Sequence, residues 1–404
     1  MERVTQAYMD AAASGILPGA SLFAGNINGK TIYSKSLGKA SIKEGVELPF
    51  TDATVCGIAS MGKLMVSVAA LRFVEDGRVK LDDDLRLLFN GAIDKYGVFK
   101  GFDEKTGAAI TEPNTTSITL RMLLTHTSGH GYDWLDPDLG KWRASRNERP
   151  WVNGRTVETK TAVPLSFVPG TGFVYGSAHD WVGRVLEITK GSGTLEEIMR
   201  ECVWEPLGIQ DGVSFWPKTK EHMASRMAHI ATLNEKGEGP ATDASYFDLS
   251  GPPGSCFGGS GIFCSPAAYN TFLTAVADRD KRLLRSATFD ELFRPQLDEK
   301  CEQSLNDLIT SAPIYEQAIG MNIPRSTRRN WCFAGAILKE GHDGRFAPGT
   351  VTWGGLTCSQ WFIDFKSGTY GSVLCQMLPP LCPSVMILHE KFQRAVHDRT
   401  SARL

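Results

Sequence analysis

The stretch Ser-Met-Gly-Lys-Leu-Met-Val-Ser-Val-Ala-Ala-Leu-Arg-Phe-Val-Glu-Asp, residues 60–76, decides the fold. The apolar side chains that recur in it at helical spacing are Leu64, Val68, Leu71 and Val74. Gly77 follows them, at the position where a glycine commonly ends a helix. The stretch therefore predicts a helix whose first turn carries the pattern Ser-x-x-Lys.

Ser-x-x-Lys occurs twice in the chain, and its surroundings separate the two copies. Ser36 and Lys39 lie in a strand-like run, where residues three apart point to opposite faces. Ser60 and Lys63 open a helix, where residues three apart are neighbours, so the lysine can reach the serine hydroxyl. A base within hydrogen-bond reach activates a serine, and a buried lysine of lowered pKa can be that base. Taken alone, the four residues fit an ordinary helix N-cap at Ser60 better than a catalytic site.

Strand-like runs lie near both ends of the chain. After a predicted helix over 1–13, a hairpin is expected from residues 20–25 and 31–34, and a further extended run covers 36–42. The runs near the other end are 350–353, 360–363 and 371–375, and a final helix is expected over 383–397. The pattern predicts one sheet made from both ends of the chain, with a helical domain inserted.

We place the α/β domain in residues 1–82 and 251–404 and a mainly helical domain in residues 83–250. Two stretches of the inserted part, 102–117 and 136–166, have the composition of loops. The tryptophans in or near the second are Trp134, Trp142 and Trp151, which form either a local core or the wall of a pocket. The glycine-dense run 251–261 forces tight turns, and a helix is expected from Pro266 to about Asp278.

The composition excludes several classes of protein. Of the 404 residues, 42% are hydrophobic and 22% charged, which is ordinary globular usage and excludes a disordered chain, a collagen-like repeat and a disulfide miniprotein. A net charge of −2 supplies no field that would attract nucleic acid or an anionic membrane. No apolar run is long enough to cross a bilayer, and no secretory signal is visible at the N-terminus.

The cysteines indicate a reducing compartment. There are nine, an odd number, and none forms a Cys-x-x-Cys pair, so reduced and mostly buried thiols are expected, in a cytoplasmic protein. The sequence contains no Gly-x-Ser-x-Gly, no phosphate-binding glycine loop and no His-Glu-x-x-His, and its eight histidines lack zinc-ligand spacing. We therefore expect neither a metal ion nor a cofactor.

Four further motifs follow Ser60 and Lys63 along the chain. They are Leu-Leu-Thr-His-Thr-Ser-Gly (123–129), Phe-Val-Tyr-Gly-Ser (173–177) followed by Asp180 and Trp181, Cys-Phe-Gly-Gly-Ser-Gly (256–261) and Trp-Gly-Gly (353–355). In this order the set resembles the serine β-lactamase and penicillin-binding-protein family, in which Ser-x-x-Lys is a signature. The match is closest to its esterase and acyltransferase branch, and within that to the fungal lovastatin-type acyltransferases. It covers about residues 16–394.

The resemblance implies a fold and a set of catalytic roles. The fold is α/β, β-lactamase/transpeptidase-like, with an antiparallel sheet flanked by helices and an inserted mainly helical domain. Ser60 is the acylated nucleophile, and Lys63 takes or shares its proton. Tyr175 acts with Lys63 as general base and passes the proton to the leaving group. The backbone N–H groups of Ser60 and Leu356 form the oxyanion hole.

The resemblance also suggests which residues bind the substrate. Trp353, Gly354 and Gly355 belong to the strand that closes the pocket, and Trp134 and Trp361 are further candidates for substrate contact. The segment 353–355 stands where lactamases have Lys-Thr-Gly, so the cation for a β-lactam carboxylate is missing and ester or thioester substrates are favoured.

Three other residues have different implications. Ser177 stands where an asparagine is usual, which weakens the case for hydrolysis by the lactamase route. A Ser-Lys-Tyr site needs no histidine, so His126 and His179 are expected to be structural.

Three functions remain open at this point. The first is a serine acyltransferase that moves an acyl group from a thioester or ester donor to a hydroxyl of a small hydrophobic acceptor in secondary-metabolite (polyketide) biosynthesis. The donor is carried by an acyl carrier protein or by a small thiol. The second is a carboxylesterase that uses the same residues with water as acceptor. The third is a non-catalytic binding module with the same fold.

Overall fold

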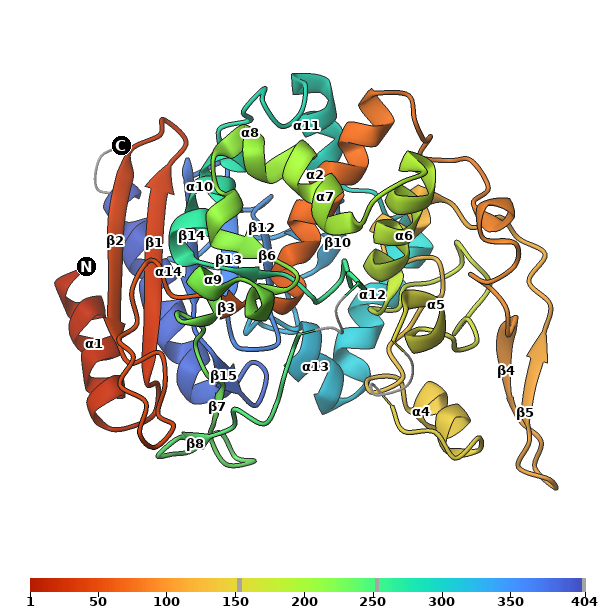
Figure 1. The fold of residues 1–404 in the computed structure, drawn as a ribbon, viewed down its shortest axis with the longest axis horizontal. Coiled ribbons are helices and arrows are strands. Elements are labelled where there is room, and N and C mark those ends of the chain that lie inside the picture. The colour runs from red at the N-terminus through yellow and green to blue at the C-terminus, as the bar shows by residue number, and fades with distance from the viewer. Residues whose placement is uncertain (151–154, 251–253, 402–404) are drawn as a thin grey trace.

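A seven-stranded antiparallel sheet built from both ends of the chain is the centre of the molecule (Figure 1). The computed structural model describes residues 1–150, 155–250 and 254–401. In spatial order the strands are β10 (Arg329–Trp331), β11 (Ala336–Leu338), β12 (Val351–Gly354), β13 (Gln360–Asp364), β14 (Thr369–Leu374), β1 (Gly19–Asn26) and β2 (Thr31–Gly38). β1 joins the two ends of the chain, because Phe23 pairs with Ser372 of β14. The predicted sheet is confirmed.

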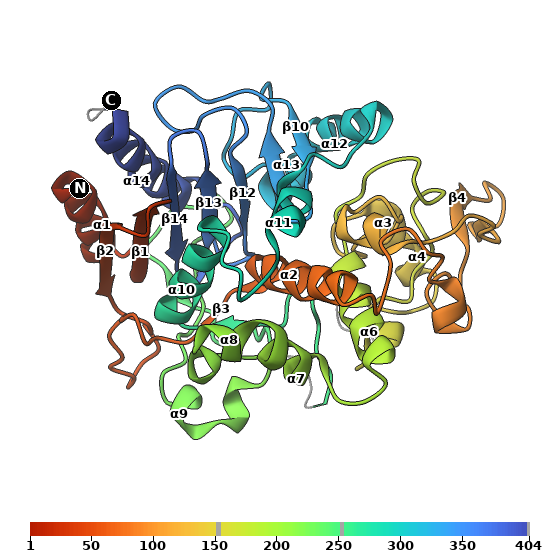
Figure 2. The ribbon, with the colours of Figure 1, turned by 90° about the horizontal axis from the view of Figure 1, so that it is seen from above.

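Helices cover both faces of this sheet (Figure 2). On one side lie α1 (Glu2–Ala13) and α14 (Pro383–Ser401), which pack against each other. On the other lie α10 (Pro266–Ala277) and α2 (Gly62–Glu75), with α11 (Ser286–Phe293) against α2. Because β13 and β14 have helices on both sides, every residue of the two strands is buried. The helices expected from residues 1, 60, 266 and 383 are all present.

The inserted part of the chain packs around α2. Its helices are α3 (Leu120–Leu124), α4 (Pro137–Ala144), α5 (Val157–Lys160), α6 (Ala178–Lys190), α7 (Leu195–Met199), α8 (Glu205–Leu207) and α9 (Glu221–Ala224). α6 contacts both α2 and α3, and it brings the segment that carries Tyr175 toward the start of α2. The remaining helices, α12 (Glu299–Ser311) and α13 (Pro313–Ile319), lie beside β10.

The two stretches expected to be loops contain regular structure. β4 (Val98–Phe102) and β5 (Ala109–Glu112) form a hairpin whose turn is closed by the Asp103 carboxylate, which accepts the backbone N–H groups of Lys105 and Thr106. In the second stretch, Asp136 caps the short helix α4, whose first residue is a proline. Side-chain caps of this kind leave little trace in hydrophobic periodicity, which is why the two expectations were wrong.

The tryptophans of the second stretch have different surroundings. Trp142 packs with Leu139 and Val163 in a small local core, whereas Trp134 lines a cavity described below. Trp151 lies outside the described residues.

Short strands connect the inserted part to the main sheet domain. β6 (Val213–Ser214) and β3 (Cys56–Gly57) both pair with β9 (Phe263–Cys264), and β7 (Ala231–Thr232) lies between β15 (Met377–Leu378) and β8 (Thr242–Asp243). The division at residues 82/83 and 250/251 stays a prediction. No helix within the described residues is long and apolar enough to cross a membrane.

Candidate active site

Ser60 lies in a single 3-10 turn, Ala59–Met61, that leads from β3 into α2. The turn begins with a left-handed residue, Ala59, at φ 45°, a conformation that costs energy for any side chain larger than glycine. The Lys63 ammonium donates a hydrogen bond to Ser60 Oγ at 2.9 Å. Within the described contacts Ser60 caps neither the turn nor α2, so the serine faces the lysine as the Ser-x-x-Lys spacing predicts.

Lys63 is buried and fully engaged. It is 3% exposed, and its ammonium donates to Ser60 Oγ, to the Tyr132 hydroxyl at 3.3 Å and to the Gly259 carbonyl at 2.6 Å. An ammonium group has three N–H donors and no acceptor, and these three oxygens match it. The amine is thereby held at a fixed place beside the candidate nucleophile.

Tyr175 completes the group that the sequence predicts. Its hydroxyl accepts a hydrogen bond from the Trp353 indole N–H at 3.1 Å, and its ring centre lies 4.9 Å from Lys63 Nζ. The structure therefore brings Ser60, Lys63 and Tyr175 together. Trp353 contributes its indole N–H to this group as well as its ring.

Tyr132 is a residue of the site that the sequence analysis missed. Its hydroxyl accepts the hydrogen bond from Lys63, its ring meets the Tyr175 ring edge-on at 5.8 Å, and burial raises its pKa well above the ordinary value. The available signal was its place three residues after the Thr-Ser-Gly motif, in a loop that folds back toward α2. A tyrosine in a loop is too common for that signal to stand out.

A small cavity opens above Ser60. It is lined by Ala59, Ser60, Tyr132, Trp134, Tyr175, Leu249, Ser260, Ala318, Met321, Trp353, Gly354, Gly355, Leu356, Pro380 and Leu381. The predicted residues Trp134, Trp353, Gly354, Gly355 and Leu356 are all in this lining.

The prediction that Trp361 contacts the substrate is wrong. Although it pairs with Trp353 across β12 and β13, it is 0% exposed and is not among the described residues that line the cavity. Trp361 belongs to the core beneath the cavity.

The two histidines lie behind the catalytic group. His126 is fully buried with its ring centre 4.7 Å from that of Tyr175, and His179 Nε2 lies 3.2 Å from Ser67 Oγ. Burial holds the pKa of each well below the ordinary value, so both are neutral. Neither is among the described residues that line the cavity.

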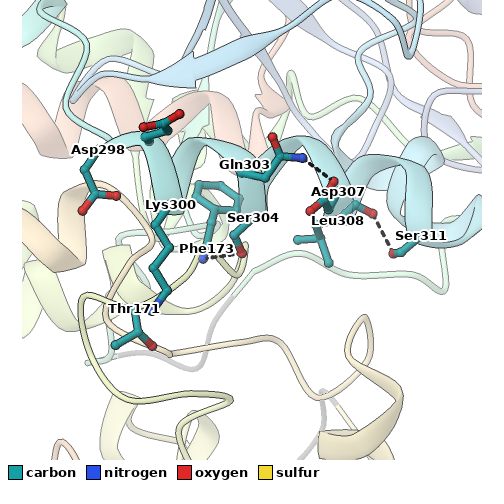
Figure 3. Close-up of a pocket in the computed structure, with 10 residues that line it drawn as sticks. Thr171, Phe173, Asp298, Lys300, Gln303, Ser304, Asp307, Leu308 and Ser311 are labelled. Carbon is teal, nitrogen blue, oxygen red and sulfur yellow. Dashed lines mark hydrogen bonds between the residues drawn. The ribbon is translucent and has the colours of Figure 1, made fainter.

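A second, more open groove runs along α12 (Figure 3). There the Ser304 hydroxyl accepts the backbone N–H of Phe173, and Asp298 and Lys300 stand at its edge. Ser60, Lys63 and Tyr175 are not among its described lining residues, so this groove is separate from the catalytic group. Within the described part of the chain, no cluster of three or more His, Cys, Asp or Glu side chains is arranged to hold a metal ion.

Comparisons with known proteins agree with this geometry. The family model described as Beta-lactamase matches residues 1–384. A lovastatin esterase from Penicillium rubens is 32% identical over 100% of this chain and 99% of its own length. A monacolin J acid methylbutanoyltransferase from Aspergillus terreus is 31% identical over 97% of this chain and 94% of its own.

A solved structure extends the similarity to the fold. A mutant of simvastatin synthase from Aspergillus terreus superposes with a TM-score of 0.88 at 30% identity, covering 99% of this chain and 97% of that one. The expected β-lactamase/transpeptidase-like fold is confirmed, and so is the class of enzyme, serine acyltransferase or esterase. The chain belongs to the β-lactamase family.

Proposed function

We propose that the protein transfers an acyl group from a thioester or ester donor, through an acyl-Ser60 ester, to a hydroxyl of a small hydrophobic acceptor. The observation that carries the proposal is the contact of 2.9 Å between Lys63 Nζ and Ser60 Oγ at the floor of a largely apolar cavity. Hydroxyl activation, room for an acyl chain and space for an alcohol are what such a transfer needs.

The reaction follows from the placement of these groups. Lys63, once it has released a proton, takes the Ser60 proton as Oγ forms its bond to the acyl carbon. The backbone N–H groups of Ser60 and Leu356 stabilise the oxyanion. As the carbon–sulfur bond breaks, Tyr175 gives its hydroxyl proton to the leaving thiolate and recovers a proton from Lys63. The acceptor hydroxyl then enters the same cavity, loses its proton to the same pair and takes the acyl group from Ser60.

The cavity favours neutral esters over β-lactams. No lysine or arginine is among the described residues that line it, and Trp353 occupies the place of the lactamase lysine with its N–H directed at Tyr175. A carboxylate at this position would find no cation to balance its charge.

The relatives support a place in polyketide metabolism. Two are named for acting on lovastatin or monacolin J acid. We propose that the donor is a thioester on an acyl carrier protein or a small thiol, and that the acceptor is a small polyketide alcohol. The nine free cysteines, eight of them buried, support the cytoplasm as the place of work.

A carboxylesterase is the second candidate function, because one relative similar to this chain is named a lovastatin esterase. The two functions share every step up to acyl-Ser60 and differ only in whether water or an alcohol attacks it. A non-catalytic binding module is disfavoured, since such a module has no need for the contact between Lys63 and Ser60.

The first experiment is intact-mass measurement after exposure to a butanoyl thioester of N-acetylcysteamine. We expect one added butanoyl group on the wild type, located at Ser60 by peptide mapping, and none on Ser60→Ala. The second measures products with and without an alcohol acceptor. Free acid alone at high acceptor concentration would establish the esterase, and no adduct at all would favour the binding module.

A further inference from the structure

Asp180 is a buried carboxylate that the reaction described above does not use. It lies in the first turn of α6, is 3% exposed, and its Oδ1 accepts the backbone N–H of Gly259 at 2.7 Å. That hydrogen bond joins α6 to the glycine-rich segment that ends at Gly261.

Gly259 in turn connects Asp180 to the catalytic lysine. The Gly259 carbonyl accepts the shortest of the three hydrogen bonds that Lys63 donates, at 2.6 Å. A methyl group added at this glycine would lie 3.0 Å from Asp180 Oδ1 and 3.2 Å from the Tyr132 hydroxyl. A side chain at residue 259 would crowd both oxygens, so glycine lets the backbone pass here without displacing them.

Two positively charged side chains lie near Asp180, Lys63 on α2 and Lys160 on α5. Burial raises the pKa of the Asp180 carboxyl group, and the hydrogen bond from Gly259 and the charges of the two lysines oppose this rise. Tyr132 and Asp133 share a small cavity with Lys160 and Asp180. Asp133 is paired with Arg143 at 2.9 Å, so its charge is already balanced by a partner of its own.

We propose that Asp180 is a positioning residue for Lys63: it fixes the Gly259 carbonyl that holds the ammonium and supplies the counter-charge that favours this ammonium form. The inference rests on the proposed function, in which Lys63 must release a proton before it can take the one from Ser60. Asp180 therefore sets the place of the amine and supplies a negative charge near it.

The isosteric variant Asp180→Asn tests the charge. An asparagine oxygen can still accept the Gly259 N–H, but the negative charge is gone. The ammonium then loses its proton more easily, so the acidic limb of the kcat/KM profile for the butanoyl thioester moves down by about 1 pH unit. Above that limb, kcat/KM falls about tenfold because the amine is a weaker base.

Gly259→Ala tests the position of the Gly259 carbonyl separately from the charge of Asp180. The added methyl group displaces the carbonyl while Asp180 keeps its charge, so kcat/KM falls about a hundredfold without a downward shift of the limb. It also keeps the inference testable if Asp180→Asn does not fold.

Glu196→Gln is the matched control. Glu196 is also a buried carboxylate that accepts a backbone N–H, that of Phe215 at 2.8 Å, but its ion pair is with Lys220. We expect its pH profile to equal that of the wild type even if its melting temperature falls.

An unchanged or upward-shifted limb in Asp180→Asn would overturn the inference, as would an equal shift in Glu196→Gln. Wild-type activity in Gly259→Ala would overturn the positioning role. If the wild type formed no acyl-Ser60, the proposed function itself would fail and take this inference with it.

Discussion

The cavity has two walls of different construction. One wall is polar: Ser60, Tyr132 and Tyr175 line it, and they and Lys63 behind them take part in hydrogen bonds of 2.6 to 3.3 Å. The other wall is apolar, and its members come from separate segments of the chain, Leu249, Ala318, Met321 and Leu381. The side chains of the first wall are held by directional contacts, and those of the second by packing.

Met321 shows how the apolar wall is nevertheless kept in place. Met321 and Asn322 both have left-handed backbones, at φ 57° and 51°. The buried Arg329 donates to the carbonyls of Gly320 and Ile323, and the buried Arg345 donates to that of Asn322. Hydrogen bonds to its backbone thus fix the segment from Gly320 to Ile323. The side chain at position 321, which lines the cavity, can therefore be replaced by one of another size without moving the segment.

The difference between the walls teaches where chemistry and specificity reside. A change in the polar wall removes a directional contact and lowers the rate of every acyl transfer. A change in the apolar wall alters volume by a few atoms and changes only which acyl group fits. The predictions below test this division, beginning with the largest effect.

Ser60→Ala removes the nucleophile, so we expect acyl transfer to fall by at least about a thousandfold and the acyl adduct to vanish. Ser36→Ala is the matched control from the second Ser-x-x-Lys, because Ser36 Oγ donates to Ser21 Oγ on the paired strand β1. Steady-state transfer from a butanoyl thioester and intact mass measure both. Residual transfer near the wild-type rate in Ser60→Ala would place the chemistry elsewhere.

The two tyrosines of the polar wall should differ in importance. Tyr175→Phe removes a general base, with an expected loss of about a thousandfold in kcat. Tyr132→Phe removes only one of the three acceptors of Lys63, with an expected loss of about tenfold. Both variants keep the aromatic ring, so kcat of the purified variants, at matched melting temperature, makes the comparison. The reverse order would make Tyr132 the base.

Met321→Ala tests the apolar wall. Removing the side chain enlarges the cavity, so the ratio of kcat/KM for a hexanoyl over a butanoyl thioester should rise about tenfold, with the butanoyl kcat nearly unchanged. Met9→Ala is the control, since Met9 is 51% exposed on α1. An equal loss for both donors would mean that Met321 supports the catalytic group and that the two walls are not independent.

Much of the polar wall is predictable because its residues act over short sequence distances or within motifs. A helix brings Ser60 and Lys63 together at a spacing of three, and Tyr175 comes just before the helix α6, which packs on α2. The sheet is predictable from strand-like runs of residues near both ends of the chain.

The rest depends on contacts that the sequence does not encode locally. Tyr132 reaches Lys63 across 69 residues, and Gly259 does so across 196, through loops whose paths no periodicity describes. Trp361 was misplaced because its full burial depends on how the sheet packs, which no local pattern in the sequence describes. The hairpin β4–β5 was missed because the side-chain caps of its turn have no hydrophobic signal.

Ser177→Ala is the prediction with the smallest expected effect. Ser177 stands where the resemblance to β-lactamases leads us to expect an asparagine, yet its Oγ is buried and, among the described residues, has no hydrogen-bond partner. It lines the small cavity beside Asp180 and not the one above Ser60. Deleting an unsatisfied hydroxyl costs little, so kcat should stay within about twofold and the unfolding free energy within about 1 kcal/mol. A loss of tenfold or more would show that Ser177 has taken over the work of the asparagine and that the polar wall extends beyond Tyr175.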